Sequence, residues 1–465
     1  MNRNNIFIHL ALALVLVLVA AFAGQLNRWR KQMPLEVRIV PTSEKKQPTT
    51  TEEIALTENG SLGSPEVLVK FRSGVSQERI DQLTAAFHDR VEDRIENAEG
   101  WEAVDDLDNA DATTVVDQYL KLPEVEDAEP NYVIKLEDFD LSESIRPSDP
   151  QFDDQWALAN SGQKGGKEGA DISATVAWAK TTGSDKVVVA VLDTGVDYSH
   201  EDLASNMWVR PDSLAPYHDD QLGTIDDANG FNAIDNSADP MDDNGHGTHC
   251  AGIIGAEGGN DVGIAGVNWK VQIMPLKFMN SGGFGNTKDA IEAINYVIDR
   301  KKHGVNVRII SASWGSTQKS RALGDVIRKA YENDILFVAA AGNASTNNDR
   351  QPHYPSSYDN VLSVAALDRK DQLASFSNYG VKSVAIAAPG AEILSTWLDN
   401  QYEEKSGTSM ATQVVAGVAA LVLAEHPRMS VADLKEKLLA STDPIVALKG
   451  KIATGGRINA AKALE

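Results

Sequence analysis

The chain has 465 residues, 42% of them hydrophobic and 24% charged, which is enough for a globular core in two or three domains. Its formal net charge of −24 argues against nucleic acid as a partner, because a strongly acidic chain repels phosphate backbones. The single cysteine, Cys250, excludes an intramolecular disulfide, so an exported form needs other stabilising devices, such as metal ions.

An apolar run at residues 6–23 follows a short polar start. The run ends in Ala-Phe-Ala, the small-x-small pattern that precedes a signal-peptidase cut, and it is also just long enough to span a bilayer. Basic residues after the run suit neither reading well. We predict a signal peptide or a membrane anchor over residues 1–24, with the rest of the chain secreted or anchored outside the cytoplasm.

Residues 25–64 are predicted to be a linker, because their second half is rich in Thr, Glu, Pro and Ser without periodicity. A small α+β module is predicted over residues 65–137, with the order of a split β-α-β motif. Its expected strands and helices lie at residues 66–71, 76–87, 113–120 and 132–134. Residues 138–150 are a second irregular link.

From residue 151 onward the pattern changes to apolar runs that alternate with helical spacing. Near-continuous apolar runs of this kind are typical of strands buried on both faces of a parallel sheet. They occupy residues 187–192, 271–276, 307–310, 335–341 and 361–364. Helical patterns occupy residues 287–300, 323–333 and 414–424. The alternation predicts a doubly wound, mostly parallel α/β domain over residues 151–465.

Three segments of this domain carry side chains suited to chemistry. Asp193 ends a predicted strand, at the sheet edge where α/β proteins build their sites. His246 lies between glycines, three residues before His249, and Ser409 lies in a small-residue turn before an apolar helix. Singly, these are ordinary turn, surface or loop residues. In the order Asp, His, Ser they are a far more specific signal.

On these segments the chain resembles the subtilase family from about residue 148 onward, chiefly its thermitase and proteinase K branches. The segments are Asp193-Thr194-Gly195, His246-Gly247-Thr248-His249, Ala340-Ala341-Gly342-Asn343, Ala388-Pro389-Gly390 and Gly407-Thr408-Ser409-Met410-Ala411-Thr412. The upstream module, with its end Glu129-Pro130-Asn131-Tyr132, is similar to a subtilase propeptide. The resemblance implies a subtilisin-like fold after a ferredoxin-like inhibitory propeptide, and we expect a monomer.

The resemblance implies a serine endopeptidase that cleaves proteins or peptides through an acyl-enzyme. Ser409 would be the nucleophile, His246 its general base and later acid, and Asp193 the group that orients the imidazole. The Asn343 side chain and the Ser409 N–H would bind the oxyanion. His249 would be a packed or hydrogen-bonding residue. The module upstream would inhibit the enzyme until the enzyme itself cuts the link.

Substrate would bind by strand addition, between two segments and over a primary pocket that the resemblance supplies. These residues are Gly283, Phe284, Gly285, Ser313, Trp314, Gly315, Ala339, Ala340 and Ala341. Small residues in the pocket favour a large apolar P1 side chain, and His353 at its rim leaves the specificity open.

The resemblance also implies a structural Ca²⁺ site, since hard cations take several oxygen ligands. Its ligands would be the side chains of Asp149, Asp202 and Asn260 and the backbone carbonyls of Glu257, Val262 and Ile264. Two further acidic stretches, at residues 218–227 and 235–243, are expected to be solvated loops.

One departure from the family follows the serine motif, where Gln413-Val414 replaces the usual Pro-His. No atom of the three catalytic side chains is lost, so we expect activity. A catalytically impaired binding module is the alternative, although it predicts a missing catalytic residue and none is missing. A zinc hydrolase built on His246 and His249 lacks the nearby Glu of the usual metalloprotease helix.

Overall fold

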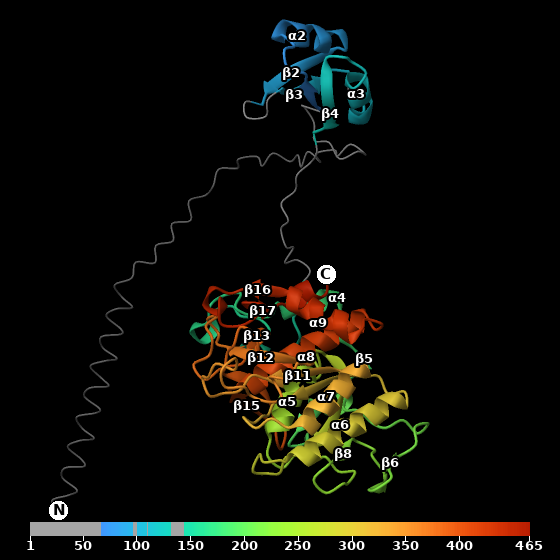
Figure 1. Cartoon of the computed structure of the whole chain (residues 1–465), viewed down its shortest axis with the longest axis vertical. Coiled ribbons are helices and arrows are strands. Elements are labelled where there is room, and N and C mark those ends of the chain that lie inside the picture. Colours follow the sequence, from blue (N-terminus) through green and yellow to red (C-terminus); the bar gives the residue numbers. More distant parts are fainter. Residues whose placement is uncertain (1–66, 96–99, 109, 132–143) are drawn as a thin grey trace, which may run out of the picture. The chain divides into compact units, whose positions relative to one another are not determined.

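The structure, a computed structural model, describes residues 67–95, 100–108, 110–131 and 144–465. The chain divides into two compact units, Met1–Asp138 and Phe139–Glu465 (Figure 1). The expected N-terminal segments 1–24 and 25–64 and the strand at 132–134 lie outside the described residues.

The first unit has the predicted order of strands and helices. Its elements are β1 (Val67–Phe71), α2 (Gln77–Ala86), β2 (Asp89–Arg94), β3 (Trp101–Asp106), α3 (Ala112–Tyr119) and β4 (Val125–Pro130). The sheet order is β2-β3-β1-β4, and every pairing is antiparallel. Val67, Val69 and Phe71 alternate inward along β1 and pack with the apolar faces of both helices. The prediction of a small α+β module is confirmed.

A nine-stranded sheet forms the centre of the second unit. Its order is β16 (Thr442–Pro444), β17 (Gly456–Ile458), β13 (Ile386–Pro389), β12 (Val361–Leu367), β11 (Leu336–Ala340), β10 (Val307–Ala312), β5 (Gly183–Asp193), β9 (Lys270–Lys277) and β8 (Phe231–Asn232). All neighbours are parallel except β16 and β17. This confirms the doubly wound α/β class.

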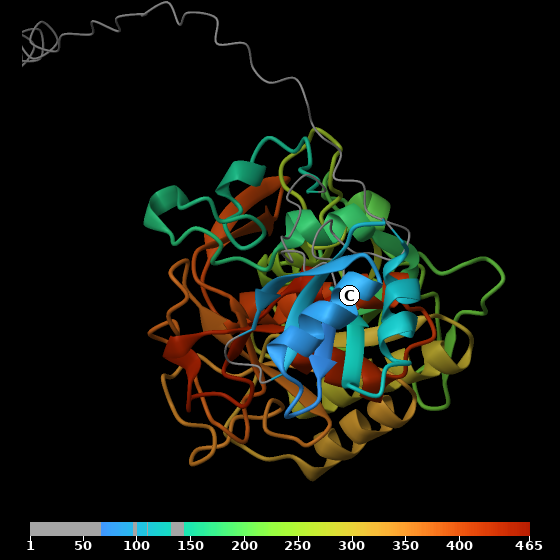
Figure 2. The ribbon, with the colours of Figure 1, turned by 90° about the horizontal axis from the view of Figure 1, so that it is seen from above.

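Helices cover both faces of this sheet (Figures 1 and 2). One face packs against α4 (Ala174–Lys180), α5 (His246–Gly255), α8 (Thr408–Glu425) and α9 (Val431–Ala440), and the other against α6 (Thr287–Lys302) and α7 (Arg321–Glu332). Successive residues of β5 point to opposite faces, so Val189 and Val191 join the first core while Val188 and Ala190 join the second.

Among the described residues, α8 alone is long and apolar enough to cross a membrane, and 89% of its apolar window is buried inside the protein. Its burial between the sheet and α5 explains its composition, because a helix that is apolar all round lies in a core or in a membrane.

The sheet order positions the site. After β5 the chain adds β8 and β9 on one side of it and then β10 on the other side, so strand order reverses at β5. Loops diverge at such a point and leave room for a site beyond the carboxyl ends of the strands. Asp193 is the last residue of β5, and Ser313 follows β10 directly.

Candidate active site

The structure places Asp193 and His246 in direct contact. The His246 Nδ1 lies 2.7 Å from the Asp193 Oδ1, which also accepts a hydrogen bond from the Thr194 N–H. The Asp193 side chain is buried, whereas 32% of the His246 side chain is exposed and open to a substrate. Burial by itself lowers the pKa of His246, but the adjacent carboxylate outweighs it and holds that pKa well above its ordinary value.

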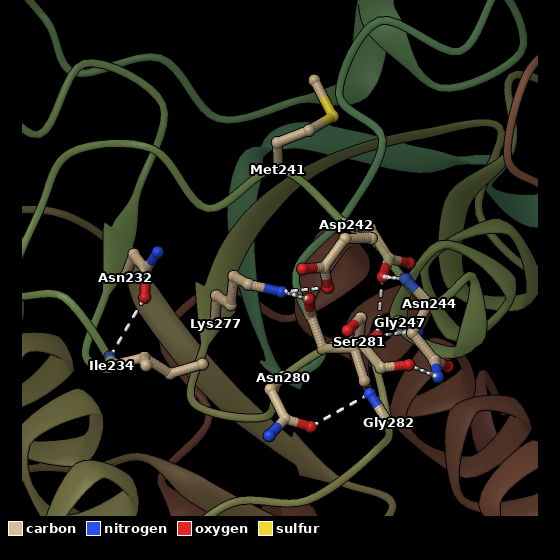
Figure 3. Close-up of polar contacts among 12 residues, drawn as sticks. Asn232, Ile234, Met241, Asp242, Asn244, Gly247, Lys277, Asn280, Ser281 and Gly282 are labelled. Carbon is tan, nitrogen blue, oxygen red and sulfur yellow. Dashed lines mark hydrogen bonds and ion pairs between the residues drawn. The ribbon is translucent and has the colours of Figure 1, made fainter.

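Buried polar contacts, some of them drawn in Figure 3, fix the start of α5, the helix that begins at His246. Asp242 accepts hydrogen bonds from the hydroxyls of Thr194 and Thr248 and from the N–H groups of Asn244, Gly245 and Thr248. The Lys277 ammonium donates to the Thr194 carbonyl and to Asp243, both at 2.6 Å. These contacts join the end of β5 to the histidine helix.

Gly247 permits the closest approach in this region. A Cβ on it would lie 2.0 Å from the Gly195 carbonyl oxygen, which is closer than real contacts allow. Only glycine therefore lets α5 begin against the turn that follows Asp193.

The acidic stretches that we expected to be solvated are partly buried. Asp242 is 6% exposed and serves the helix start described above, so the expectation is wrong for it. Asp227 is fully buried, accepts a hydrogen bond from the Tyr296 hydroxyl at 2.8 Å and pairs with Arg210 and Arg300. Burial of these carboxylates is compensated by protein donors, a feature that spacing in the sequence does not reveal.

Cys250 and His249, two buried residues of α5, have different contacts and different pKa shifts. The fully buried Cys250 Sγ lies 3.8 Å from Asp193 Oδ2 and 3.9 Å from His246 Nδ1, and burial raises the pKa of this thiol. The His249 Nε2 lies 3.1 and 2.9 Å from the carbonyls of Ile393 and Glu403, and burial lowers its pKa to about 3.

His249 is therefore a neutral, hydrogen-bonded core residue, as predicted. In the described parts of the chain, one group of three His, Cys, Asp or Glu side chains has its ligand atoms close together; it consists of Asp193, His246 and Cys250, and His249 is not in it. The geometry gives no support to a zinc site that joins the two histidines.

Ser409 lies in the first turn of α8 and is held through Ser313. The Ser409 hydroxyl donates to the Ser313 carbonyl at 3.2 Å, and the Ser313 hydroxyl donates to the Ser409 carbonyl at 3.0 Å. Ser313 also lies beside the buried Cys250 thiol. Ser409 is linked to the Asp193–His246 pair only indirectly, through Ser313 and Cys250, because its hydroxyl is bonded to the Ser313 carbonyl and not to His246.

Asn343 follows β11 and faces the same helix start. Its Oδ1 accepts hydrogen bonds from the Thr408 N–H at 2.8 Å and the Thr408 hydroxyl at 2.9 Å. A Cβ on Gly407 would lie 3.4 Å from the Asn343 Nδ2. With its oxygen engaged, the amide presents its N–H₂ beside the turn that carries Ser409.

The two segments expected to hold substrate border one pocket. Phe284 is 76% exposed, at the tip of a turn closed by the Asn280 N–H and the Phe284 carbonyl at 2.9 Å. The Asn244 side chain donates to the Ser281 carbonyl at 2.8 Å and ties this turn to the histidine loop (Figure 3). Trp314 is more enclosed: its indole donates to the Leu192 carbonyl and packs on Phe278. The pocket between the segments is lined by residues of both, including Gly285, Trp314 and Gly315.

The third segment expected to bind substrate, Ala339 to Ala341, is more buried than the wall of an open pocket would be. Ala339 and Ala341 are fully buried within core clusters, and Ala340 is 3% exposed. A Cβ on Gly315 would lie 2.1 Å from His353 Cε1, and a Cβ on Gly342 would lie 3.1 Å from His353 Cδ2. The His353 imidazole therefore lies between the Gly315 and Gly342 segments and fills space there.

Several of the residues expected to bind calcium lie around two buried carboxylates. Asp202 accepts hydrogen bonds from the Ile264 N–H at 3.0 Å and the Asn260 amide at 2.9 Å, while its own carbonyl accepts the Glu257 N–H at 2.9 Å. Asp149 accepts the Gly259 N–H through Oδ2, and its Oδ1 is buried with no partner in the described residues.

Burial raises the pKa of Asp149 and of Asp202, the latter to about 6. Two desolvated carboxylates, one of them with an unpartnered oxygen, fit a hard cation, whereas the Asn260 amide turns its nitrogen to Asp202 and its oxygen to the Val262 N–H.

Comparison with known proteins identifies the family. The profile of the subtilase family matches residues 184–457, and that of the fervidolysin N-terminal prodomain matches residues 48–131. The chain is 33% identical over 426 residues to the thermophilic serine proteinase of Bacillus sp. (strain AK1), covering 90% of this chain and 92% of that protein. It is 35% identical over 319 residues to thermitase of Thermoactinomyces vulgaris, covering 69% of this chain and 99% of thermitase.

Among solved structures, proteases from Pseudoalteromonas arctica PAMC 21717 align with a TM-score of 0.57 and 27% identity, over 68% of this chain and 98% of that chain. The chain belongs to the subtilase family. It is a serine-type endopeptidase made as a precursor with an N-terminal prodomain.

Proposed function

We propose that Asp193, His246 and Ser409 are the catalytic triad of this endopeptidase. The observation that carries the proposal is the 2.7 Å contact between His246 and Asp193, at the sheet edge where the Ser313 contacts also hold Ser409. Asp193 orients the imidazole so that Nε2 is left to take the Ser409 proton. The hydroxyl turns from the Ser313 carbonyl to His246 as it attacks the scissile carbonyl.

The negative charge that develops on the substrate oxygen falls beside the Asn343 N–H₂ and the Ser409 N–H. Preorganised donors aimed at that charge stabilise the tetrahedral intermediate more than they stabilise the substrate. His246 then returns the proton to the leaving amine, and water hydrolyses the acyl-enzyme by the same route in reverse.

Peptide substrates enter as an added strand between residues 283–285 and 313–315. Phe284 supplies an exposed apolar surface for a substrate side chain. Because His353 fills space between Gly315 and Gly342, we propose a small P1 side chain in place of the large apolar one that the alanines suggested.

The precursor is organised for self-processing. Residues 1–24 are a signal peptide or anchor, 25–64 a linker, 65–137 the inhibitory propeptide, 138–150 the processing link and 151–465 the peptidase domain. The enzyme acts outside the cytoplasm as a monomer, secreted or anchored through its N-terminal segment. A Ca²⁺ held by Asp149, Asp202, Asn260 and the loop carbonyls neutralises the buried carboxylates and stabilises the fold.

The test is to produce the full chain with Ca²⁺ beside a Ser409→Ala variant and to follow propeptide release and casein cleavage on gels. We expect the parent to process itself and digest casein, while the variant stays at full length. Circular dichroism of both confirms folding. If both chains fold and stay intact and inert, the protein is the impaired binding module. If Ser409→Ala is processed at the normal position, self-processing is wrong.

A further inference from the structure

Gln413 is a polar residue in an unusual place. It lies one turn after Ser409 in α8, on the same face of the helix, and it is 0% exposed. Helical side chains lean toward the N-terminal turn, so the Gln413 amide reaches back toward the start of α8. Neither the triad nor the oxyanion donors use this residue.

The Gln413 amide has one specific partner. Its Nε2 lies 2.5 Å from the Ser313 Oγ. A hydroxyl has one hydrogen and two acceptor sites, and the Ser313 hydrogen is already donated to the Ser409 carbonyl at 3.0 Å. The Ser313 oxygen can therefore only accept from Gln413, which requires the amide nitrogen to face it.

Two reciprocal hydrogen bonds join Ser313 and Ser409. The Ser313 hydroxyl bonds the Ser409 carbonyl, and the Ser313 carbonyl accepts the Ser409 hydroxyl at 3.2 Å. Gln413 completes this set by fixing the Ser313 hydroxyl from the helix side. A displacement of Ser313 would move both the backbone of the nucleophile and the carbonyl that holds its hydroxyl.

We propose that Gln413 is a positioning residue that holds Ser409 in the geometry for attack by acting through the Ser313 hydroxyl. The inference rests on the proposed role of Ser409. The other amide atom of Gln413 makes a sharper test possible, because the Gln413 Oε1 is buried with no partner in the described residues. A buried amide oxygen without a donor destabilises the fold, so an apolar side chain of the same length should leave stability unchanged or raised while activity falls.

The experiment compares Gln413→Met with the parent, both matured from the full chain. Turnover is normalised by titration of active sites with a fluorophosphonate. We expect kcat to fall about tenfold with KM within about twofold, because small displacements of a nucleophile reduce rate more than binding. The melting temperature should stay equal or rise. A kcat within about twofold of the parent value would overturn the proposal.

A double-mutant cycle tests the route through Ser313. In a Ser313→Ala background, Gln413→Met should change kcat by less than about twofold, because the contact is already gone. An equally large loss in both backgrounds would show that Gln413 does not act through this hydroxyl.

The matched control is Val418→Ala, which removes two fully buried methyl groups from the same helix. We expect it to lower the melting temperature and leave kcat unchanged. If Ser409→Ala keeps activity, the proposed triad fails. If Ser409→Ala is inert but Gln413→Met is fully active, only the positioning role fails.

Discussion

The protonation of His246 controls when this site can react. The imidazole must be neutral to take the Ser409 proton, while the Asp193 carboxylate at 2.7 Å favours its charged form. Cys250, whose own pKa is raised by burial, acts on the pKa of His246 in the same direction as Asp193 but by less. Asp193 is therefore the main neighbour that raises the pKa of His246 and, with it, the pH at which the site becomes active.

We predict that kcat/KM for a peptide substrate rises with pH through a midpoint above 6.5, the ordinary pKa of histidine, because His246 must first lose its proton. The measurement is kcat/KM between pH 5 and 9. Asp193→Asn removes the charge that raises this pKa. The variant should move the midpoint to lower pH and reduce kcat by roughly 10⁴-fold. An unchanged midpoint in the variant would contradict this assignment.

We predict that the parent cleaves after Ala more efficiently than after Phe, because the His353 imidazole lies against Gly315 and Gly342. His353→Gly should raise the Phe to Ala ratio of kcat/KM by roughly tenfold or more, since the vacated space accepts an aromatic ring. The measurement is kcat/KM for two peptide substrates that differ only at P1, one with Ala and one with Phe. A parent that already prefers Phe would show that the imidazole does not limit the pocket.

At the scale of elements, β2 and α3 of the first unit are joined by a buried hydrogen bond. The Tyr119 hydroxyl donates to Asp89 at 2.7 Å, and Asp89 is 6% exposed. Burial raises the pKa of Asp89 to about 6. The folded unit therefore gains stability from this carboxyl when it is protonated, and that gain is lost as pH rises from about 4 through 6.

We predict that Asp89→Asn stabilises the first unit at pH 8 by about 1–2 kcal/mol, because the amide stays neutral and keeps an acceptor for Tyr119. The measurement is hydrogen exchange of residues 67–130 in the unprocessed Ser409→Ala chain, with and without this change. The difference should shrink at pH 5, where Asp89 is protonated. Equal protection of the two chains at pH 8 would refute the prediction.

At the scale of the whole molecule, the proposed calcium ligands join distant parts of the peptidase unit. Asp149 lies at its start, Asp202 follows β5, and the loop after α5 closes around both. The carboxylates repel each other, so a cation between them should stabilise the folded state by mass action.

We predict that removal of Ca²⁺ by EDTA lowers the melting temperature by about 5–10 °C, since Ca²⁺ at 100 times its Kd contributes about 3 kcal/mol. Asp202→Asn should lower the response to Ca²⁺, while Asp220→Asn, in an exposed acidic loop, should keep it. The measurement is thermal unfolding against free Ca²⁺. An equal response in parent and Asp202→Asn would place the ion elsewhere.

Local patterns in the sequence determined the α/β class, the upstream module and the segments around Asp193, His246 and Ser409. Continuous apolar runs specify buried strands, and the order of motifs is a property of the chain itself. The tertiary structure decided which polar side chains meet. Asp227 and Asp242 are buried because arginines, hydroxyls and backbone N–H groups far apart in the chain converge on them. His353 and Gln413 meet Gly315 and Ser313 only because β10 and β11 lie side by side and α8 packs across them, and spacing along the sequence carries no information about such contacts.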